Sequence, residues 1–191
     1  ISQLGERVKE LEAEAEQASA ELQLQRQRNQ IDALTELANR SAYEHRLDVE
    51  LERFDRYQQD FCLIVADIDH FKVINDSYGH LAGDKVLRLV AQTLHKRLRR
   101  VDFIARYGGE EFAIILPATH IDNALSLMQA MGQQIRQCPF HFNNQPLQIS
   151  LSFGLAAALA GDTAESLFAR ADRALYSAKQ QGRDRCVVAN D

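Results

Sequence analysis

Two pairs of carboxylates stand where apolar runs give way to turns, and such groups can hold metal ions or transfer protons. Asp67 and Asp69 directly follow an apolar run. Glu110 and Glu111 lie in the glycine-led segment 108–112. Carboxylates at the end of a buried strand are costly unless a cation or hydrogen bonds stabilise them. Because hard oxygen ligands in a partly open site favour Mg²⁺ or Mn²⁺, we expect a metal-dependent site at Asp67 and residues 108–112.

A purely structural explanation exists for the same residues. A GGEE turn is often a solvated hairpin tip, and Asp67 or Asp69 would then cap the following helix. The combination favours the metal site, because up to four clustered carboxylates repel one another unless protons or cations neutralise them.

The elements around these residues predict one α+β domain. Apolar or alternating runs predict strands, and amphipathic stretches predict helices. Strands are expected at 61–66, 103–107, 112–116, 147–158 and 185–188. Helices are expected at 41–57 with Ser41 as the cap, in a short stretch ending at 77–80, and at 81–98, 121–137 and 162–180. The resulting order, βααββαβ with an added C-terminal helix and strand, is that of a ferredoxin-like split βαβ fold, a sheet that often forms the palm of nucleotidyl-transfer enzymes.

Residues 1–31 have a different pattern and predict a helical stalk, with the domain at 32–191. Apolar residues recur at alternating steps of three and four, at Ile1, Leu4, Val8, Leu11, Ala15, Ala18 and Leu22. This a/d seam favours a parallel dimeric coiled coil over a single solvated helix, because the stripe is too narrow to dock on a globular core. Polar Gln25 and Asn29 would weaken the last turns. Since the helical pattern is already present at Ile1, we expect a preceding sensor or membrane anchor.

Composition excludes several classes of protein. A net charge of −5 and a pI near 5.7 do not match the basic surface of a nucleic-acid-binding domain. Cys62, Cys138 and Cys186 lie far apart, which indicates reduced thiols in the cytoplasm and no zinc site. No apolar run reaches the ~18 residues of a membrane span, and no signal peptide is present.

Several segments together resemble the GGDEF family of diguanylate cyclases, in its GGEEF form. The similarity covers about residues 32–188, and the combination of segments is far more specific than any one of them. The segments are DALTELANR at 32–40, DIDHFKVIND at 67–76, GHLAGD at 79–84, RYGGEEF at 106–112, SLSFGLA at 150–156 and ADRALYSAKQQGR at 171–183.

The resemblance implies a role for each matching residue. Asp67 and Glu110, with the carbonyl of Ile68, would hold Mg²⁺ or Mn²⁺. Asn75 and Asp84 would bind the guanine edge of GTP, with His80 beside them. Lys72 would bind the phosphates, together with main-chain N–H groups near His70 and Phe71. Lys179 and Arg183 would bind the β- and γ-phosphates.

The implied reaction converts two GTP molecules into cyclic di-GMP and two pyrophosphates. Each 3′-hydroxyl attacks the α-phosphorus of the other GTP, so positioning and charge stabilisation dominate, with Glu110, Lys72 and Asp67 as the catalytic groups. Guanine offers an N1–H and N2–H₂ donor pair that adenine lacks, and a carboxylate such as Asp84 accepts from it. Leaving that acceptor unpaired would cost roughly 1–3 kcal/mol.

Simpler explanations remain open for the cationic residues. Lys179 and Arg183 would also serve as charges at a helix C-terminus. His80 would also cap a turn, and Lys72 would also be an exposed helix lysine.

The product is two-fold symmetric, which implies that two half-sites face each other in a homodimer. The stalk would keep two domains close and raise their effective concentration.

A second site is expected at Arg99 and Asp102, whose RxxD spacing before Gly108 matches the family's inhibitory product site. The alternative is a basic helix end at 96–100.

One position departs from the family pattern. Glu36 stands where the LTGL block usually has Gly, and a left-handed backbone there would strain Glu. Because this block connects the stalk to the domain, the departure bears on signal transmission and not on catalysis.

Two rival functions remain open. One is a non-catalytic receptor for GTP or cyclic di-GMP, and the other is a nucleotide cyclase with another base preference, which Asn75 and Asp84 disfavour.

Overall fold

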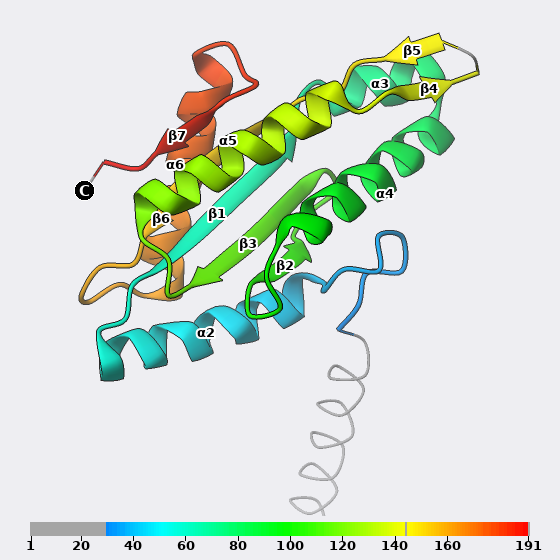
Figure 1. Cartoon of the computed structure of the whole chain (residues 1–191). Helices are drawn as coiled ribbons and strands as arrows, with labels where there is room; N and C mark the ends of the chain where they lie inside the picture. The colour runs from blue at the N-terminus through cyan, green and yellow to red at the C-terminus, as the bar shows by residue number, and fades with distance from the viewer. Residues whose placement is uncertain (1–29, 144, 191) are drawn as a thin grey trace, which may run out of the picture.

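The central strand of the domain, β1 (Phe61–Ile68), carries Asp67 near its end (Figure 1). The computed structural model describes residues 30–143 and 145–190, so the predicted coiled coil lies outside the described residues. One mixed sheet has the order β2-β3-β1-β6-β7. Its other strands are β2 (Phe103–Arg106), β3 (Glu111–Pro117), β6 (Leu151–Ala157) and β7 (Cys186–Val188).

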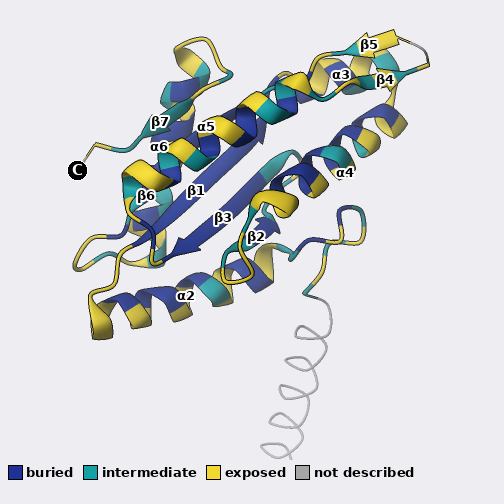
Figure 2. Cartoon of the chain, in the orientation of Figure 1, coloured by how far each residue is buried: buried dark blue, intermediate teal, exposed yellow. Residues whose placement is uncertain are grey.

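Helices cover both faces of this sheet (Figure 1). One face packs against α3 (Phe71–Tyr78), α4 (His80–Arg97) and α5 (Ile121–Gln137), and the other against α2 (Arg40–Tyr57) and α6 (Ala164–Gln180). Side chains alternate across a strand, so Ile64 faces the α4–α5 layer whereas Leu63 and Val65 face α2 and α6. All eight residues of β1 are buried, as the dark strand in Figure 2 shows.

The predicted α+β, ferredoxin-like order is confirmed. β1 runs antiparallel to both β3 and β6, and β7 joins β6 in parallel as the added edge strand. Asp67 pairs with Glu111 across the β1–β3 ladder. The topology therefore brings the two acidic segments of the sequence together at one end of the sheet.

Most other boundaries shift by one or two residues from the sequence prediction, and two differences have a clear physical reason. The cap of α2 is Asn39 and not Ser41, because the extended backbone of Asn39 lets its side chain accept from the N–H of Ala42 at 3.1 Å. The strand expected at 147–158 is divided. Leu147 belongs to a separate hairpin of β4 (Phe140–Phe142) and β5 (Gln145–Leu147), residues 148–150 lie in no strand, and β6 begins only at Leu151.

The backbone at Glu36 is left-handed, with φ of 60°, which is the condition under which a strained Glu was expected at this position. The N–H of Glu36 donates to the carbonyl of Asp32 at 2.9 Å, and both the N–H and the hydroxyl of Thr35 donate to the Asp32 carboxylate. The turn is therefore held by Asp32 although Glu36 is strained.

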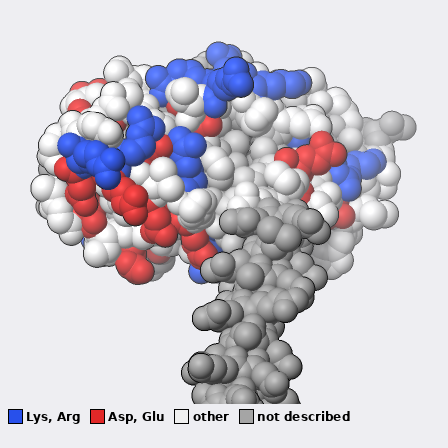
Figure 3. All heavy atoms as spheres, turned by 90° about the horizontal axis from the view of Figure 1, so that it is seen from below, with Lys and Arg blue, Asp and Glu red and all other residues white. Residues whose placement is uncertain are grey.

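Within the described residues, no helix has the length and hydropathy needed to cross a bilayer. The face that includes α2 carries interspersed basic and acidic side chains (Figure 3). Charges of both signs therefore lie close together on this surface.

Candidate functional site: an acidic centre beside α6

Asp67 is a buried carboxylate paired with a lysine from α6. The Nζ atom of Lys179 lies 2.8 Å from Oδ2 of Asp67, whose side chain is 6% exposed. Burial raises the pKa of Asp67, the hydrogen bond and charge of Lys179 lower it in part, and the balance stays above the ordinary value. The pairing depends on close packing at Gly154 of β6, where a Cβ would lie 2.1 Å from the carbonyl oxygen of Ala171 in α6.

Glu110 and Glu111 lie in the hairpin beside Asp67. The main-chain N–H of Ile68 donates to the carbonyl of Glu110 at 3.3 Å. Burial raises the pKa of both glutamates, and the charge of Asp67 raises each further. Three carboxyl groups therefore share one region in which each disfavours the charge of the others.

Asp69 is close enough for its charge to raise the pKa of Asp67, but its carboxylate is hydrogen-bonded to other partners. Its carboxylate accepts hydrogen bonds from the hydroxyls of Ser150 and Ser152, each at 2.7 Å, and from the N–H of Asp184 at 3.0 Å. β1 ends at Ile68, so Asp69 turns toward β6 and the segment after α6. Neither aspartate caps α3, whose N-cap residue is His70.

The donor set of Asp67 and Glu110 fits a hard divalent cation. Among residues 30–143 and 145–190, no three His, Cys, Asp or Glu side chains form a group that could hold a metal. A site here would rest on these two carboxylates and a main-chain oxygen such as that of Ile68. Burial raises the pKa values of Asp67 and Glu110 most, and the charge of Asp69 on Asp67 and that of Asp67 on Glu110 raise them further. A nearby cation would offset these effects, and Lys179 offsets them in part here.

A second group of predicted residues lies where α3 meets α4. The Oδ1 atom of Asn75 is buried and has no hydrogen-bond partner within the described part of the chain. A Cβ at Gly83 would lie 2.1 Å from that oxygen, so only glycine leaves Asn75 its position. Asp84 follows directly and is half-buried. An unsatisfied buried acceptor beside a carboxylate is suited to a ligand that presents paired N–H donors.

The remaining predicted contacts surround these two groups. Phe71 is buried and anchors the start of α3, whereas His70, Lys72 and His80 are exposed. His70 has a left-handed backbone, and its carbonyl accepts from the N–H of Ile74 at 3.2 Å. The exposed residues are free to meet a ligand, but they are not brought into contact with Asp67.

Arg183 lies in the loop after α6 and acts on the acidic centre at a distance. Its positive charge lowers the pKa of Asp67, although it does so less than Lys179. Its N–H donates to the carbonyl of Ala178 at 3.0 Å, which closes the end of the helix.

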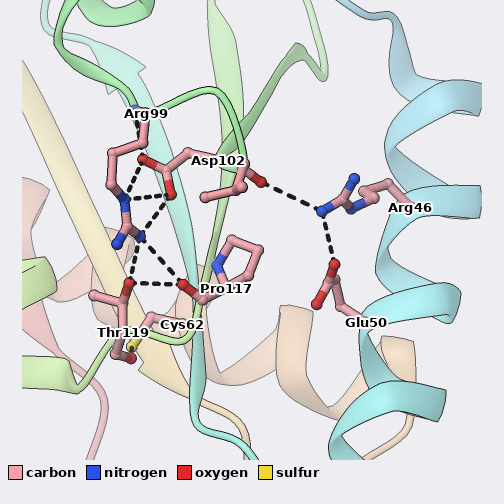
Figure 4. A network of polar contacts seen from close by, with 8 residues as sticks. Arg46, Glu50, Cys62, Arg99, Asp102, Pro117 and Thr119 are labelled. Carbon is pink, nitrogen blue, oxygen red and sulfur yellow. Dashed lines mark hydrogen bonds and ion pairs between the residues drawn. The ribbon is translucent and has the colours of Figure 1, made fainter.

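Arg99 and Asp102 are engaged with each other (Figure 4). The Asp102 side chain is fully buried and accepts from the main-chain N–H of Arg99 and from its guanidinium, both at 2.7 Å. The same guanidinium donates to the Thr119 hydroxyl at 2.7 Å and to the Pro117 carbonyl at 3.2 Å. Arg99 is the accessible member of the pair, being 55% exposed, and Asp102 holds it in place.

Two networks at the site were not predicted from the sequence. Arg106 donates to Asp32 and to the carbonyls of Gly108 and Gly109, which ties the acidic hairpin to the entry turn. Asp69 joins β1 to the segment after α6 through Asp184. All these residues except Asp184 lie in the segments that resemble the family, so the sequence marked them as important. It did not show their pairing, because Arg106 and Asp32, like Asp69 and Asp184, are far apart in the chain.

Comparison with known proteins agrees with this geometry. Residues 29–185 match the profile described as "Diguanylate cyclase, GGDEF domain". The chain is 49% identical over 189 residues to the diguanylate cyclase DgcP of Pseudomonas aeruginosa, and 38% identical over 159 residues to the response regulator PleD of Caulobacter vibrioides. These matches cover 99% and 82% of this chain but only 28% and 35% of those proteins.

Solved structures show the same fold. The GGDEF domain of DgcB from Caulobacter crescentus in complex with c-di-GMP superposes with a TM-score of 0.83 at 36% identity, covering 85% of this chain and 97% of that one. The active GGEEF domain of a diguanylate cyclase from Vibrio cholerae gives a TM-score of 0.76 at 35% identity, with coverages of 81% and 99%. The chain therefore belongs to the GGDEF-domain family of diguanylate cyclases.

Proposed function

We propose that this domain is a diguanylate cyclase that condenses two GTP molecules into cyclic di-GMP with release of two pyrophosphates. The observation that carries the proposal is the acidic centre of Asp67 and Glu110, whose pKa values are raised and beside which Lys179 supplies positive charge. Family membership and relatives named as diguanylate cyclases support it.

The acidic centre would hold Mg²⁺ or Mn²⁺ through Asp67, Glu110 and the carbonyl of Ile68. Such an ion, when bound, lowers the pKa of the attacking 3′-hydroxyl and neutralises charge on the leaving pyrophosphate. The raised pKa of Glu110 also suits this carboxylate to accept the hydroxyl proton, because a general base works best when its pKa lies near the working pH. Asp67 and Glu110 would thus orient the reacting groups through the ion, and Glu110 would also receive the proton.

The cations of the chain would bind the triphosphate. Lys72, Lys179 and Arg183 would contact the phosphates, and main-chain N–H groups near His70 and Phe71 would assist Lys72. Phosphoryl transfer depends mainly on positioning and charge stabilisation, so these residues contribute electrostatically. The proximity of Lys179 to Asp67 supports its assignment, because it brings one of these cations to the acidic centre.

The junction of α3 and α4 would select guanine. The buried oxygen of Asn75 and the carboxylate of Asp84 are acceptors that guanine can satisfy with its N1–H and N2–H₂ groups, with His80 close by. Adenine would leave them unpaired, at a cost of roughly 1–3 kcal/mol.

Catalysis would require two copies of the chain, because the two-fold product needs two facing half-sites. Residues 1–31 would form the dimeric stalk, residues 32–191 would form the catalytic domain, and a preceding sensor would control their arrangement. We place the domain in the cytoplasm.

Product would inhibit the enzyme at Arg99 and Asp102. The exposed guanidinium of Arg99 would fork onto guanine or phosphate, and Asp102 would keep it oriented. Inhibition from this site would be an allosteric coupling between two distinct sites.

The test is to incubate the purified chain with GTP and Mg²⁺ and to separate the products by chromatography. Cyclic di-GMP with two pyrophosphates per product is the expected result, and ATP should give no cyclic dinucleotide. A dimeric protein that binds cyclic di-GMP but forms none from GTP would contradict the proposal and support a receptor instead.

A further inference from the structure

We propose that Asp69 is a positioning residue that, together with Arg136, fixes the loop 181–185 so that Arg183 faces the acidic centre. The inference rests on the proposed function, in which Arg183 binds the triphosphate. It begins from Asp69 itself, which is buried and lies two residues after Asp67 but has other partners.

Three donors converge on the Asp69 carboxylate. The hydroxyl of Ser152, which is fully buried, donates to Oδ1, and the hydroxyl of Ser150 donates to Oδ2. Oδ2 also accepts from the main-chain N–H of Asp184, the residue that follows Arg183. All three partners donate in this arrangement, so the side chain at this position must offer acceptors on both of its terminal atoms, as a carboxylate does.

The backbone of the loop is held in an unfavourable conformation. Gly182, Arg183 and Asp184 have φ values of 111°, 63° and 51°, so three consecutive residues are left-handed. Residues with a Cβ adopt this conformation at a cost and keep it only when surrounding contacts enforce it. The bond from Asp184 to Asp69 is one such contact, and it lies directly beside Arg183.

A second contact holds the side chain of the same residue. Nη1 of Arg136, near the end of α5, lies 2.5 Å from Oδ1 of Asp184. A hollow of about 230 Å³ between α5 and β7 adjoins this ion pair, with Met128, Leu151 and Phe153 in its lining. The loop therefore has space into which it can move once the ion pair is lost.

The two contacts locate Arg183 relative to Asp67. Asp69 connects the loop to β1 and β6, and Arg136 connects it to α5, so the loop is fixed to the elements that also position Asp67. A displacement of about 1 Å in a group that binds reacting substrate can lower the rate by as much as ~10²-fold. Arg136 itself is assigned no ligand contact, so any effect of replacing it on GTP must pass through the loop.

The test is a double-mutant cycle between Arg136→Met and Arg183→Ala, with kcat/KM for GTP as the readout. We expect Arg136→Met to lower kcat/KM about tenfold in the wild-type background and less than twofold when Arg183 is already alanine. Arg88→Met, at an exposed arginine of α4, is the matched control and should change little. Asp69→Asn should behave as Arg136→Met does, and Ser150→Ala, which removes one of the donors that orient the Asp69 carboxylate, replaces it if that variant does not fold.

A binding comparison separates positioning from general damage to the fold. GMP lacks the β- and γ-phosphates, so its affinity, measured by calorimetry, should stay the same in Arg136→Met while that of GTP falls. The inference would be overturned if Arg136→Met lowered the affinities for GTP and GMP equally. It would also be overturned if Arg136→Met lowered kcat/KM as much in the Arg183→Ala background as in the wild type. If the wild-type chain forms no cyclic di-GMP, the proposed function fails, and the GTP-against-GMP comparison still tests the role of Asp69 and Arg136.

Discussion

Nη1 of Arg106 lies 3.2 Å from each carboxylate oxygen of Asp32, which joins the entry turn of the domain to the hairpin that carries Glu110. The other nitrogens of the same guanidinium donate to the carbonyls of Gly108 and Gly109. Both side chains are about one-fifth exposed, so solvent screens the pair only in part. A movement of the entry turn would therefore reach the acidic centre through one residue.

Asp32→Asn should destabilise the fold in a pH-dependent way. Burial raises the pKa of Asp32, but hydrogen bonds from Thr35 and Arg106 together lower it below its ordinary value of 3.8. A lowered pKa means that the stabilisation is complete above the ordinary value and is lost as the pH falls through the folded value. Urea unfolding should show a loss of about 1–2 kcal/mol at pH 7 that shrinks toward pH 3. The exposed Asp55→Asn is the control, and a difference that does not vary with pH would contradict the ionic role.

Glu110→Gln should abolish cyclic di-GMP formation, with a loss of at least about 10²-fold, while the protein stays folded. Because burial and the charge of Asp67 raise the pKa of Glu110, the folded structure disfavours its charged form, and the neutral amide should leave the melting temperature unchanged or higher. Chromatographic product assays and thermal unfolding measure the two effects. Glu52→Gln, on the exposed side of α2, is the control. Unchanged turnover in the Glu110 variant would refute its assignment.

Gly83→Ala should weaken GTP recognition without unfolding the domain. The added Cβ would lie 2.1 Å from Oδ1 of Asn75 and must displace that side chain. Loss of one acceptor for guanine should raise KM about tenfold. Gly132→Ala is a matched change in another helix, where the new Cβ would be 3.4 Å from Phe153 and the gain in helix propensity is up to about 1 kcal/mol. Equal KM values in the two variants would show that Asn75 does not contact the base.

Arg99→Ala should relieve product inhibition while turnover at low product is retained. The exposed guanidinium of Arg99 is the accessible part of the predicted site, and Asp102 is buried behind it. The concentration of cyclic di-GMP that halves the rate should rise at least about tenfold. The neighbouring exposed Arg100 supplies the control variant Arg100→Ala. Inhibition that survives in Arg99→Ala would mean that this residue is only a charge at the helix end.

Glu36→Gly should stabilise the domain by about 0.5–1 kcal/mol in urea unfolding at neutral pH. Its φ of 60° costs a residue with a Cβ about 1–2 kcal/mol, of which glycine's greater loss of chain entropy cancels a part. Glu36→Ala keeps the strain and should show no gain. A gain in both variants would point to the side chain and not to the backbone.

Local patterns were enough to predict most elements of the fold. The spacing of apolar residues gave the bounds of α5 as they are observed, at Ile121–Gln137, because an amphipathic helix repeats one pattern along its whole length. The cap of α2 and the division of the strand at 147–158 were not predictable in this way. They depend on the backbone conformation of Asn39 and on the pairing of β5 with β4, which neighbouring residues do not determine.

The sequence by itself determined the family, the order of the elements and the residues that we propose for the acidic centre and for guanine recognition. Only the tertiary structure decided how those residues are used. It separated Asp67, paired with Lys179, from Asp69, bound to Ser150, Ser152 and Asp184. The physical reason is that β1 ends between the two aspartates, and the partners of each arrive from strands, helices and loops that are distant in the chain.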